Sequence, residues 1–292
     1  MLKCLTRKSD PVCKAQSYKL KNRKYREEQI IAEGGYAYIW KCENFAIKRI
    51  FIQSQEVYKM AMQEISIMTR LPEHPNIVKL VDYGEVKIQN KMFVCLVMEF
   101  CSSNLFSVLQ QEVLSERRIV EIFKQILDGL EVLHAEQISH RDLKLENILL
   151  LGETFKLCDF GSASNEIIDL SQLNKAQLLQ QEEVFSQTTT ITYRPPEMID
   201  VLTRQVIDTK VDIWQLGCIL YSMCFRKSAF SEQNKIGIAQ ALFEIPQSQI
   251  SISTVTLIQK MLQQDPKKRP TIKEIKISLY GGTEEDEWGE FQ

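Results

Sequence analysis

His-Arg-Asp-Leu-Lys-Leu-Glu-Asn occupies residues 140–147, and Asp-Phe-Gly follows at residues 159–161. Asp142 can accept a proton from a hydroxyl group, and Lys144 can neutralise negative charge on a phosphate. Asn147 and Asp159 carry the oxygen atoms that hard divalent cations prefer as ligands. A proton acceptor, a cation and two metal-ligand candidates on nearby loops predict a site that binds a nucleotide together with a magnesium ion.

The chain between these two motifs has the pattern of a β-hairpin. Residues 147–150 form a short apolar run, Gly152 marks a turn, and residues 154–158 alternate between polar and apolar side chains. Two antiparallel strands would bring Asn147 and Asp159 to the same end of the hairpin. The alternative is a turn-rich loop with solvated charges, which matching segments upstream and downstream disfavour.

A buried ion pair is predicted nearer the beginning of the chain. Residues 45–48 read Phe-Ala-Ile-Lys, a strand pattern that carries one lysine, and residues 54–70 have the apolar spacing of a helix. Glu64 falls on the apolar face of that helix, where a carboxylate is costly unless it is paired. Lys48 is the available partner. The alternative places Glu64 at the edge of the apolar face, where its carboxylate reaches solvent.

Length and composition limit the classes of protein to which the chain can belong. It has 292 residues, of which 44% are hydrophobic, and this suits a two-lobed domain with a sizeable core. The net charge of −2 argues against a general nucleic-acid binder. The eight cysteines lack paired short spacing and read as reduced core residues, and no signal peptide or membrane-spanning run is visible. A cytoplasmic protein is expected.

Charge is concentrated at the two ends of the chain. Residues 1–26 contain nine lysines or arginines and one acid, whereas residues 281–292 contain five acids and no base. The basic end either serves only to solubilise the chain or contacts anionic lipid headgroups, at ~1 kcal/mol per charge near the surface. The acidic end carries Trp288 and Phe291, which either bind a partner or fold back onto the chain itself.

These motifs resemble those of protein kinases. The pattern H-R-D-x-K-x-x-N followed by D-F-G is typical of them, Phe45–Lys48 is similar to the V-A-I-K strand, and residues 194–197 are similar to the end of an activation segment, with Pro195 where A-P-E has alanine. Residues 32–37, Ala-Glu-Gly-Gly-Tyr-Ala, resemble the unusual loop of the Numb-associated kinase family, which includes adaptor-associated, cyclin-G-associated and actin-regulating kinases. The resemblance covers about residues 25–280.

The resemblance implies an α+β protein with the two-lobed protein-kinase fold. A β-rich N-lobe would occupy about residues 25–98, a hinge residues 99–103, and a mainly α-helical C-lobe residues 104–280. A basic arm over residues 1–24 would precede this domain, and an acidic tail over residues 281–292 would follow it.

The resemblance also implies ATP and Mg²⁺ as cofactors and assigns roles to particular residues. The catalytic group would be Asp142, Lys144, Lys48 and Glu64, and the metal ligands would be Asn147 and Asp159. The nucleotide would be bound by Ala32, Gly34, Ala37, Ile39, Ala46, Lys48, Met98, Glu99, Cys101 and Leu149, with Met98 as the gatekeeper. The phosphate loop departs from the kinase pattern, because Ala32 and Ala37 stand where glycine is usual and restrict the backbone.

Several supporting contacts are expected further along the chain. Asp212 begins an apolar helix predicted over about residues 210–224 and would be a buried acceptor near the catalytic loop. Glu197 would pair with Arg269. By resemblance to the Numb-associated kinases, residues 198–212 are expected to contain an extra helix.

The segment from Asp159 to Glu197 is expected to be partly mobile or unusually arranged. Its leucines near residues 170–179 predict a short helix, and Thr190 would contact the catalytic loop. The candidate phosphorylation sites are Thr188, Thr189 and Thr192.

The chain is therefore expected to be a serine/threonine protein kinase, since Lys144 fits serine/threonine rather than tyrosine specificity. The resemblance implies work in endocytosis, vesicle trafficking or cortical actin, with a protein substrate such as a clathrin-adaptor subunit. A monomer that binds no nucleic acid and can contact membrane through residues 1–26 is expected. The alternatives are a catalytically inactive pseudokinase scaffold, disfavoured because the motif residues are all present, and a secretory-route kinase of the same family.

Overall fold

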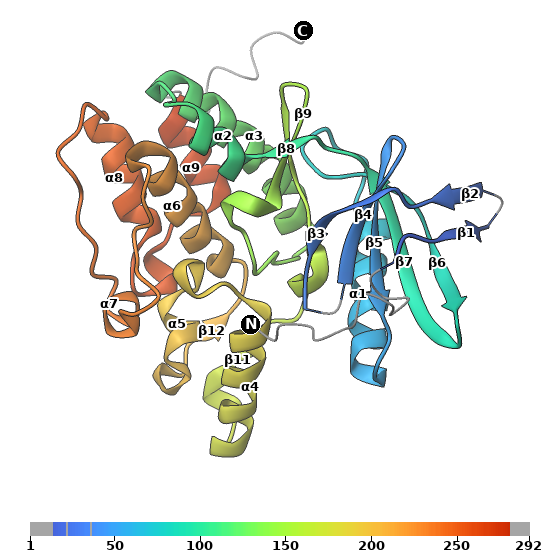
Figure 1. Cartoon of the computed structure of the whole chain (residues 1–292). Coiled ribbons are helices and arrows are strands. Elements are labelled where there is room, and N and C mark those ends of the chain that lie inside the picture. Colours follow the sequence, from blue (N-terminus) through green and yellow to red (C-terminus); the bar gives the residue numbers. More distant parts are fainter. Residues whose placement is uncertain (1–13, 22, 36, 281–292) are drawn as a thin grey trace, which may run out of the picture. The chain divides into compact units, whose positions relative to one another are not determined.

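The computed structural model describes residues 14–21, 23–35 and 37–280, and the chain separates into two compact units between Ser102 and Ser103 (Figure 1). The first unit is rich in strands and the second is mainly helical, so the chain is an α+β protein as expected. The acidic tail and most of the basic arm lie outside the described residues, and the predictions made for them stay predictions. None of the described helices is long and apolar enough to cross a bilayer.

A five-stranded antiparallel sheet forms the centre of the first unit, with the strand order β3-β4-β5-β7-β6. The strands are β3 (Gln29–Glu33), β4 (Ala37–Cys42), β5 (Phe45–Phe51), β6 (Leu80–Ile88) and β7 (Lys91–Glu99). The helix α1 (Gln55–Arg70) begins where the Ser54 side chain accepts a hydrogen bond from the Val57 N–H at 3.3 Å. The predicted strand at residues 45–48 and the predicted helix at residues 54–70 are thereby confirmed.

A hairpin of β1 (Ser17–Leu20) and β2 (Arg23–Arg26) packs against this sheet. Its alternating Tyr18, Leu20 and Tyr25 side chains are buried in the sheet's hydrophobic core, beside Trp40 and Phe93. The charges of this stretch predicted a solvated arm, and that prediction was wrong for residues 17–20 and 23–26. The alternation of apolar residues that buries one face of the hairpin was the signal it missed.

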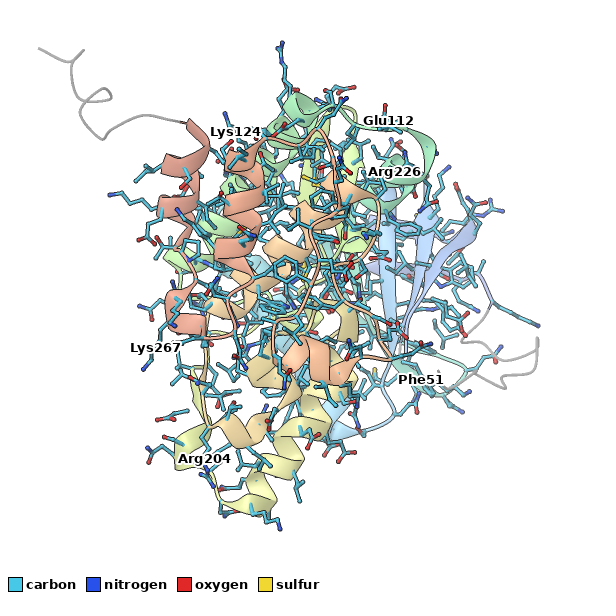
Figure 2. The ribbon with its side chains drawn as sticks, turned by 90° about the vertical axis from the view of Figure 1, so that its left-hand side faces the viewer. Phe51, Glu112, Lys124, Arg204, Arg226 and Lys267 are labelled. Carbon is cyan, nitrogen blue, oxygen red and sulfur yellow. The ribbon has the colours of Figure 1, made fainter. Side chains whose placement is uncertain are left out.

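The second unit is built around α6 (Lys210–Phe225), which is buried nearly all round because most of its side chains are apolar. The helices around it are α2 (Leu105–Gln111), α3 (Glu116–Ala135), α4 (Lys175–Thr188), α5 (Pro196–Ile199), α7 (Lys235–Ala239), α8 (Ile252–Met261) and α9 (Ile272–Tyr280). The short strands are β8 (Ser103–Asn104), β9 (Ile148–Leu151), β10 (Thr154–Leu157), β11 (Ile168–Asp169) and β12 (Val206–Ile207). Figure 2 shows Arg226, at the end of α6, beside Glu112, whose carbonyl oxygen accepts its hydrogen bond at 3.1 Å.

The extra helix expected at residues 198–212 is absent from that stretch. The chain there makes one 3₁₀ turn (Val201–Thr203), which ends at Arg204 in a left-handed conformation, and then pairs β12 with β11. The additional helix is α4, which lies before this stretch and starts at a capping box formed by Asn174 and Gln177. It is longer than the short helix predicted near residues 170–179.

Candidate active site

The predicted ion pair of the first unit is present. Lys48 on β5 donates hydrogen bonds from Nζ to both carboxylate oxygens of Glu64 on α1, at 2.7 and 2.9 Å. The side chain of Glu64 is 3% exposed and that of Lys48 is 14% exposed. The carboxylate therefore lies on the buried face of α1, as the helical spacing predicted, and the amine compensates its charge.

The residues predicted to contact the nucleotide in the first unit lie on neighbouring strands. Ala46 stands opposite Met98 in the β5–β7 register, and Ile39 stands opposite Lys48 between β4 and β5. In the turn between β3 and β4, the Gly34 N–H donates to the Ala37 carbonyl at 2.8 Å. A Cβ at Gly34 would make only ordinary contact, 3.7 Å from that carbonyl oxygen, so the turn makes no steric demand for glycine there. Ala32 lies on β3. Glu99 is the last residue of β7, and Cys101 lies two residues beyond it.

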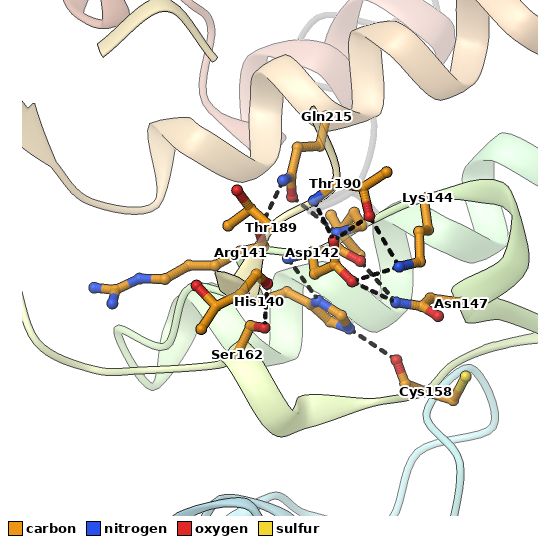
Figure 3. A network of polar contacts seen from close by, with 12 residues as sticks. His140, Arg141, Asp142, Lys144, Asn147, Cys158, Ser162, Thr189, Thr190 and Gln215 are labelled. Atoms are coloured by element: carbon orange, nitrogen blue, oxygen red, sulfur yellow. Dashed lines mark hydrogen bonds and ion pairs between the residues drawn. The ribbon is translucent and has the colours of Figure 1, made fainter. Parts of the chain in front are cut away.

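The carboxylate of Asp142 is the centre of the polar network in the second unit (Figure 3). Its Oδ1 accepts hydrogen bonds from the N–H and the hydroxyl of Thr190, at 3.0 and 2.9 Å. Its Oδ2 accepts from Lys144 Nζ at 2.7 Å and from Asn147 Nδ2 at 3.3 Å. Lys144 Nζ also donates to the Thr190 hydroxyl at 2.9 Å, so four groups fix one carboxylate. The predicted contact between Thr190 and the catalytic loop is confirmed.

Two side chains of α6 hold the backbone of the loop that carries Asp142. Asp212 is fully buried, and its carboxylate accepts the N–H groups of His140 and Arg141, both at 2.8 Å, and His134 Nε2 at 2.9 Å. Its predicted role as a buried acceptor is confirmed. Gln215, one turn further along, accepts the Leu143 N–H at 2.9 Å and donates to the Arg141 carbonyl at 2.8 Å. Gln215 was not predicted, although a polar side chain on a helix that is buried all round was a usable signal.

The two metal-ligand candidates lie at the same end of the predicted hairpin. The strands β9 and β10 are antiparallel, Ile148 stands opposite Leu157, and the Cys158 N–H donates to the Asn147 carbonyl at 3.0 Å. Asn147 also donates from Nδ2 to the Asp142 carbonyl at 2.8 Å, which fixes its amide. Asp159 adopts a left-handed conformation with φ of 61°. Leu149, the remaining predicted nucleotide contact, is half-buried on β9.

This donor set fits a hard divalent cation that shares its ligands with a phosphate. An amide oxygen and a carboxylate oxygen are ligands of the type such ions prefer, and Mg²⁺ is commonly held by one or two protein groups together with substrate phosphates. Within the described residues, no group of three or more histidine, cysteine, aspartate or glutamate side chains could hold a metal ion alone.

A second buried ion pair joins Glu197, at the end of the segment from Asp159 to Glu197, to the rest of the second unit. Arg269 donates from Nη1 and Nη2 to the two carboxylate oxygens of Glu197, each at 2.7 Å, and both side chains are buried. The bidentate geometry is the strong form of this interaction. The predicted Glu197–Arg269 pair is thus confirmed.

Burial also lowers the pKa of Arg141, although the charges of Asp212 and Glu166 oppose this shift.

Comparison with known proteins agrees with this geometry. Residues 25–280 match the family described as protein kinase domain. A probable serine/threonine-protein kinase of Dictyostelium discoideum is 39% identical over 266 residues, which cover 85% of this chain and 23% of that protein. A second one from the same organism is 34% identical over 278 residues (89% and 34%), and the serine/threonine-protein kinase ppk30 of Schizosaccharomyces pombe is 33% identical over 267 residues (85% and 28%). The chain spans between about a quarter and a third of the length of these curated relatives. From the match over residues 25–280 it follows that the chain belongs to the protein kinase domain family.

Proposed function

We propose that this chain is a serine/threonine protein kinase that transfers the γ-phosphate of ATP to hydroxyl groups of a protein substrate. The observation that carries the proposal is the arrangement around Asp142, where Lys144 and Thr190 hold one buried carboxylate in a fixed orientation. Positioning and electrostatic stabilisation, rather than covalent catalysis, are what phosphoryl transfer requires of a protein.

In the proposed reaction Asp142 orients the substrate hydroxyl and receives its proton. The hydroxyl oxygen forms a bond to the γ-phosphorus, the bond from that phosphorus to the bridging oxygen breaks, and ADP leaves with the bond's electron pair. Of the four hydrogen bonds to Asp142, the one from Asn147 to Oδ2 is the longest, at 3.3 Å. The hydroxyl can replace that contact most easily, because the weakest bond costs least to lose.

Lys144 is placed to neutralise the charge that develops on the transferred phosphoryl group. Its amine already contacts both Asp142 and the Thr190 hydroxyl, so a small movement redirects it without removing it from the site. Lys48, held by Glu64, would contact the ATP phosphates, and Asn147 and Asp159 would hold the metal ion. A bound divalent cation would supply charge neutralisation at the phosphate oxygens.

The biological setting is a finer proposal. Residues 32–37 support a place among the Numb-associated kinases, and the names of the relatives support serine/threonine specificity. We infer an endocytic or cortical-actin role, with a clathrin-adaptor subunit as the kind of substrate, for a cytoplasmic monomer. Contact of residues 1–26 with anionic membrane is part of the same proposal. The folded β1–β2 hairpin within that range supports it, since Lys19 and Lys24 stand opposite each other, both exposed, on the face of the hairpin that is not buried.

The test is phosphate transfer by the purified chain, with labelled ATP, magnesium and peptides that differ only in serine, threonine or tyrosine as the acceptor. We expect transfer to serine or threonine, and a loss of about 100-fold or more in Asp142→Asn, because the general base and the hydroxyl's orientation are both lost. Nucleotide affinity should change little in this variant.

A matched control is Asp128→Asn on α3, which removes a carboxylate that pairs with Lys276 at 2.7 Å and takes no part in the hydrogen bonds to the Asp142 carboxylate. This variant should retain the wild-type rate. Absence of transfer by the wild-type chain, with normal nucleotide binding, would instead support the pseudokinase scaffold.

A further inference from the structure

Arg194 is a buried cation whose partners are neutral. Its side chain is 7% exposed, and its hydrogen bonds go from Nε to the Thr189 hydroxyl at 2.7 Å and from Nη2 to the carbonyls of Thr189 and Ser186, at 2.8 and 3.4 Å. Among the described residues, no carboxylate lies within ion-pair distance of it. Burial lowers the pKa of Arg194, and the more distant charges of Asp142 and Glu182 oppose that shift. A buried charge of this kind is costly, so its position calls for an explanation.

The oxygens that Arg194 contacts belong to the C-terminal end of α4. The last carbonyls of a helix lack partners within the helix and carry a partial negative charge, so a cation there is favourable. Thr189 is the residue that caps α4, and both its N–H and its hydroxyl donate to the Phe185 carbonyl, at 3.1 and 2.7 Å. Phe185 is anchored in a hydrophobic cluster with Met198 and Val211. Arg194 thus joins a well-anchored helix end to the chain that follows it.

The residue directly after this cap is Thr190, which binds Asp142 through both its N–H and its hydroxyl. Ser162, just beyond Asp159, donates from its hydroxyl to the Thr188 carbonyl at 2.6 Å, so the chain on the other side of the cap is also tied (Figure 3). Movement of the Thr189 backbone would therefore carry Thr190 away from Asp142 Oδ1. The contact of Thr190 with Asp142 Oδ1 therefore depends on how firmly the end of α4 is held.

We propose that Arg194 is a positioning residue for the reaction: by clamping Thr189 at the end of α4 it places Thr190 on Asp142. This inference rests on the proposed function, and it names a residue that touches neither the substrate nor the reacting atoms. It assigns to α4 the task of holding the catalytic carboxylate in place through neutral contacts. Thr189 is buried and its hydroxyl both donates and accepts a hydrogen bond, so a phosphate there would remove the hydrogen bond that the hydroxyl donates to the Phe185 carbonyl.

The kinetic test compares Arg194→Gln and Thr189→Val with Thr189→Ser. Arg194→Gln removes the guanidinium that binds both the hydroxyl and the carbonyl of Thr189, and Thr189→Val removes only the contact with the hydroxyl. We expect kcat to fall about 10- to 100-fold, more in Arg194→Gln than in Thr189→Val, because small misplacements of a catalytic group have effects of this size. The KM for ATP should stay within about twofold, since Lys48 and Glu64 are untouched. Thr189→Ser keeps the hydroxyl and should retain a kcat close to that of the wild type.

Arg204→Gln is the matched control. Arg204 (Figure 2) also binds backbone carbonyls near α4, those of Ser171 and Leu173 at 3.2 and 3.1 Å, but it has no link to Asp142. Its loss should leave kcat unchanged. If Arg194→Gln lowers only the melting temperature, with an unchanged kcat for the folded protein, Arg194 is structural and the proposal is wrong.

A second measurement does not depend on activity. Amide hydrogen exchange followed by NMR should show that the Thr190 N–H loses protection in Arg194→Gln and in Thr189→Val, while the N–H groups of His140 and Arg141, held by Asp212, keep theirs. A wild-type chain without transferase activity would remove the proposed function, and this exchange experiment would still decide the role of Arg194. Unchanged protection of Thr190 in both variants would overturn the inference.

Discussion

Lys48 and Arg49 are neighbours on β5, yet they form two ion pairs of different character. Because successive side chains of a strand point to opposite faces, Lys48 meets Glu64 of α1 while Arg49 meets Glu27, which follows β2. The side chains of Arg49 and Glu27 are both 0% exposed, whereas Lys48 keeps 14% of its surface open. One pair is sealed, and the other leaves its cation within reach of a ligand.

The surroundings of the two pairs explain the difference. Arg49 lies over the rings of Trp40 and Phe93, with its guanidinium carbon 4.9 and 5.4 Å from their centroids, and Glu27 also accepts the Tyr18 hydroxyl at 2.8 Å. Burial raises the pKa of Glu27, against the opposing effects of Arg49 and Tyr18. This pair therefore fastens the β1–β2 hairpin to the sheet. Adjacent residues with the same charge thus separate into one structural and one proposed catalytic role by the face on which they lie.

The largest effect is expected when the sealed pair is broken. Arg49→Met leaves Glu27 buried without its cation, and we expect the free energy of unfolding to fall by about 3–5 kcal/mol, as for other buried pairs that lose one partner. Chemical denaturation of the purified chain measures this change. The kinase activity of the fraction that remains folded should be close to that of the wild type.

The double variant Glu27→Leu/Arg49→Met is the control for this experiment. It removes both charges, so no buried charge is left unpaired, and most of the stability should return, apart from the hydrogen bond that the Tyr18 hydroxyl loses. If the single variant loses less than about 1 kcal/mol, the buried pair does not fasten the hairpin, and the contrast between the two faces of β5 is wrong.

The Lys48–Glu64 pair should respond in the opposite way, with a large loss of activity and little change in stability. Lys48→Arg keeps a cation beside Glu64 but replaces a compact amine by a planar fork, so the donors no longer point where the phosphates are expected. We expect phosphate transfer to fall about 10²- to 10³-fold, the usual cost of losing an electrostatic contact in an active site, with stability changed by less than about 1 kcal/mol. The same substitution at the exposed Lys59 on α1 is the control and should change neither quantity. Full activity in Lys48→Arg would contradict the role proposed for this lysine.

The two pairs also show what could be predicted from the sequence. The Lys48–Glu64 pair was predictable because helical spacing put a carboxylate on an apolar face, and a single lysine was available nearby. The Glu27–Arg49 pair was not, because Glu27 directly follows a stretch, residues 1–26, whose many charges indicated a solvated arm. The density of charged residues predicted a solvated arm in spite of the alternating Tyr18, Leu20 and Tyr25. The structure shows that these three apolar side chains are buried and that the stretch folds as a hairpin.

In the second unit, contacts made by residues within recognisable motifs were predicted correctly. The β9–β10 hairpin, the acceptor Asp212 and the pair of Glu197 with Arg269 all follow from motif and pattern. The helix predicted near residues 170–179 was placed too early in the chain, because α4 spans Lys175–Thr188. Asn174 followed by Gln177 is a capping signal that marks this start in the sequence. The clamp of Arg194 on Thr189 could not be predicted at all, because it depends on where α4 ends, and helix ends are the least certain part of a sequence-based assignment.

The smallest predicted effect concerns the hairpin's tyrosines at high pH. Burial, together with a hydrogen bond to Asp82 at 3.1 Å, raises the pKa of Tyr25 to about 12, and burial raises the pKa of Tyr18 as well. An unfolded chain releases these protons near pH 10, whereas the folded chain keeps them, so the unfolded state binds fewer protons above pH 10 and stability falls as pH rises. The slope contributed by Tyr25 should be at most ~1.4 kcal/mol per pH unit between about pH 10 and 12. Tyr25→Phe should make the decline shallower, and the same variant at pH 8, where tyrosine is neutral in both states, separates this effect from lost packing. An identical decline in Tyr25→Phe and wild type would mean that the Tyr25 phenol ionises in the folded hairpin as readily as in the unfolded chain, and that the hairpin is not closed over it.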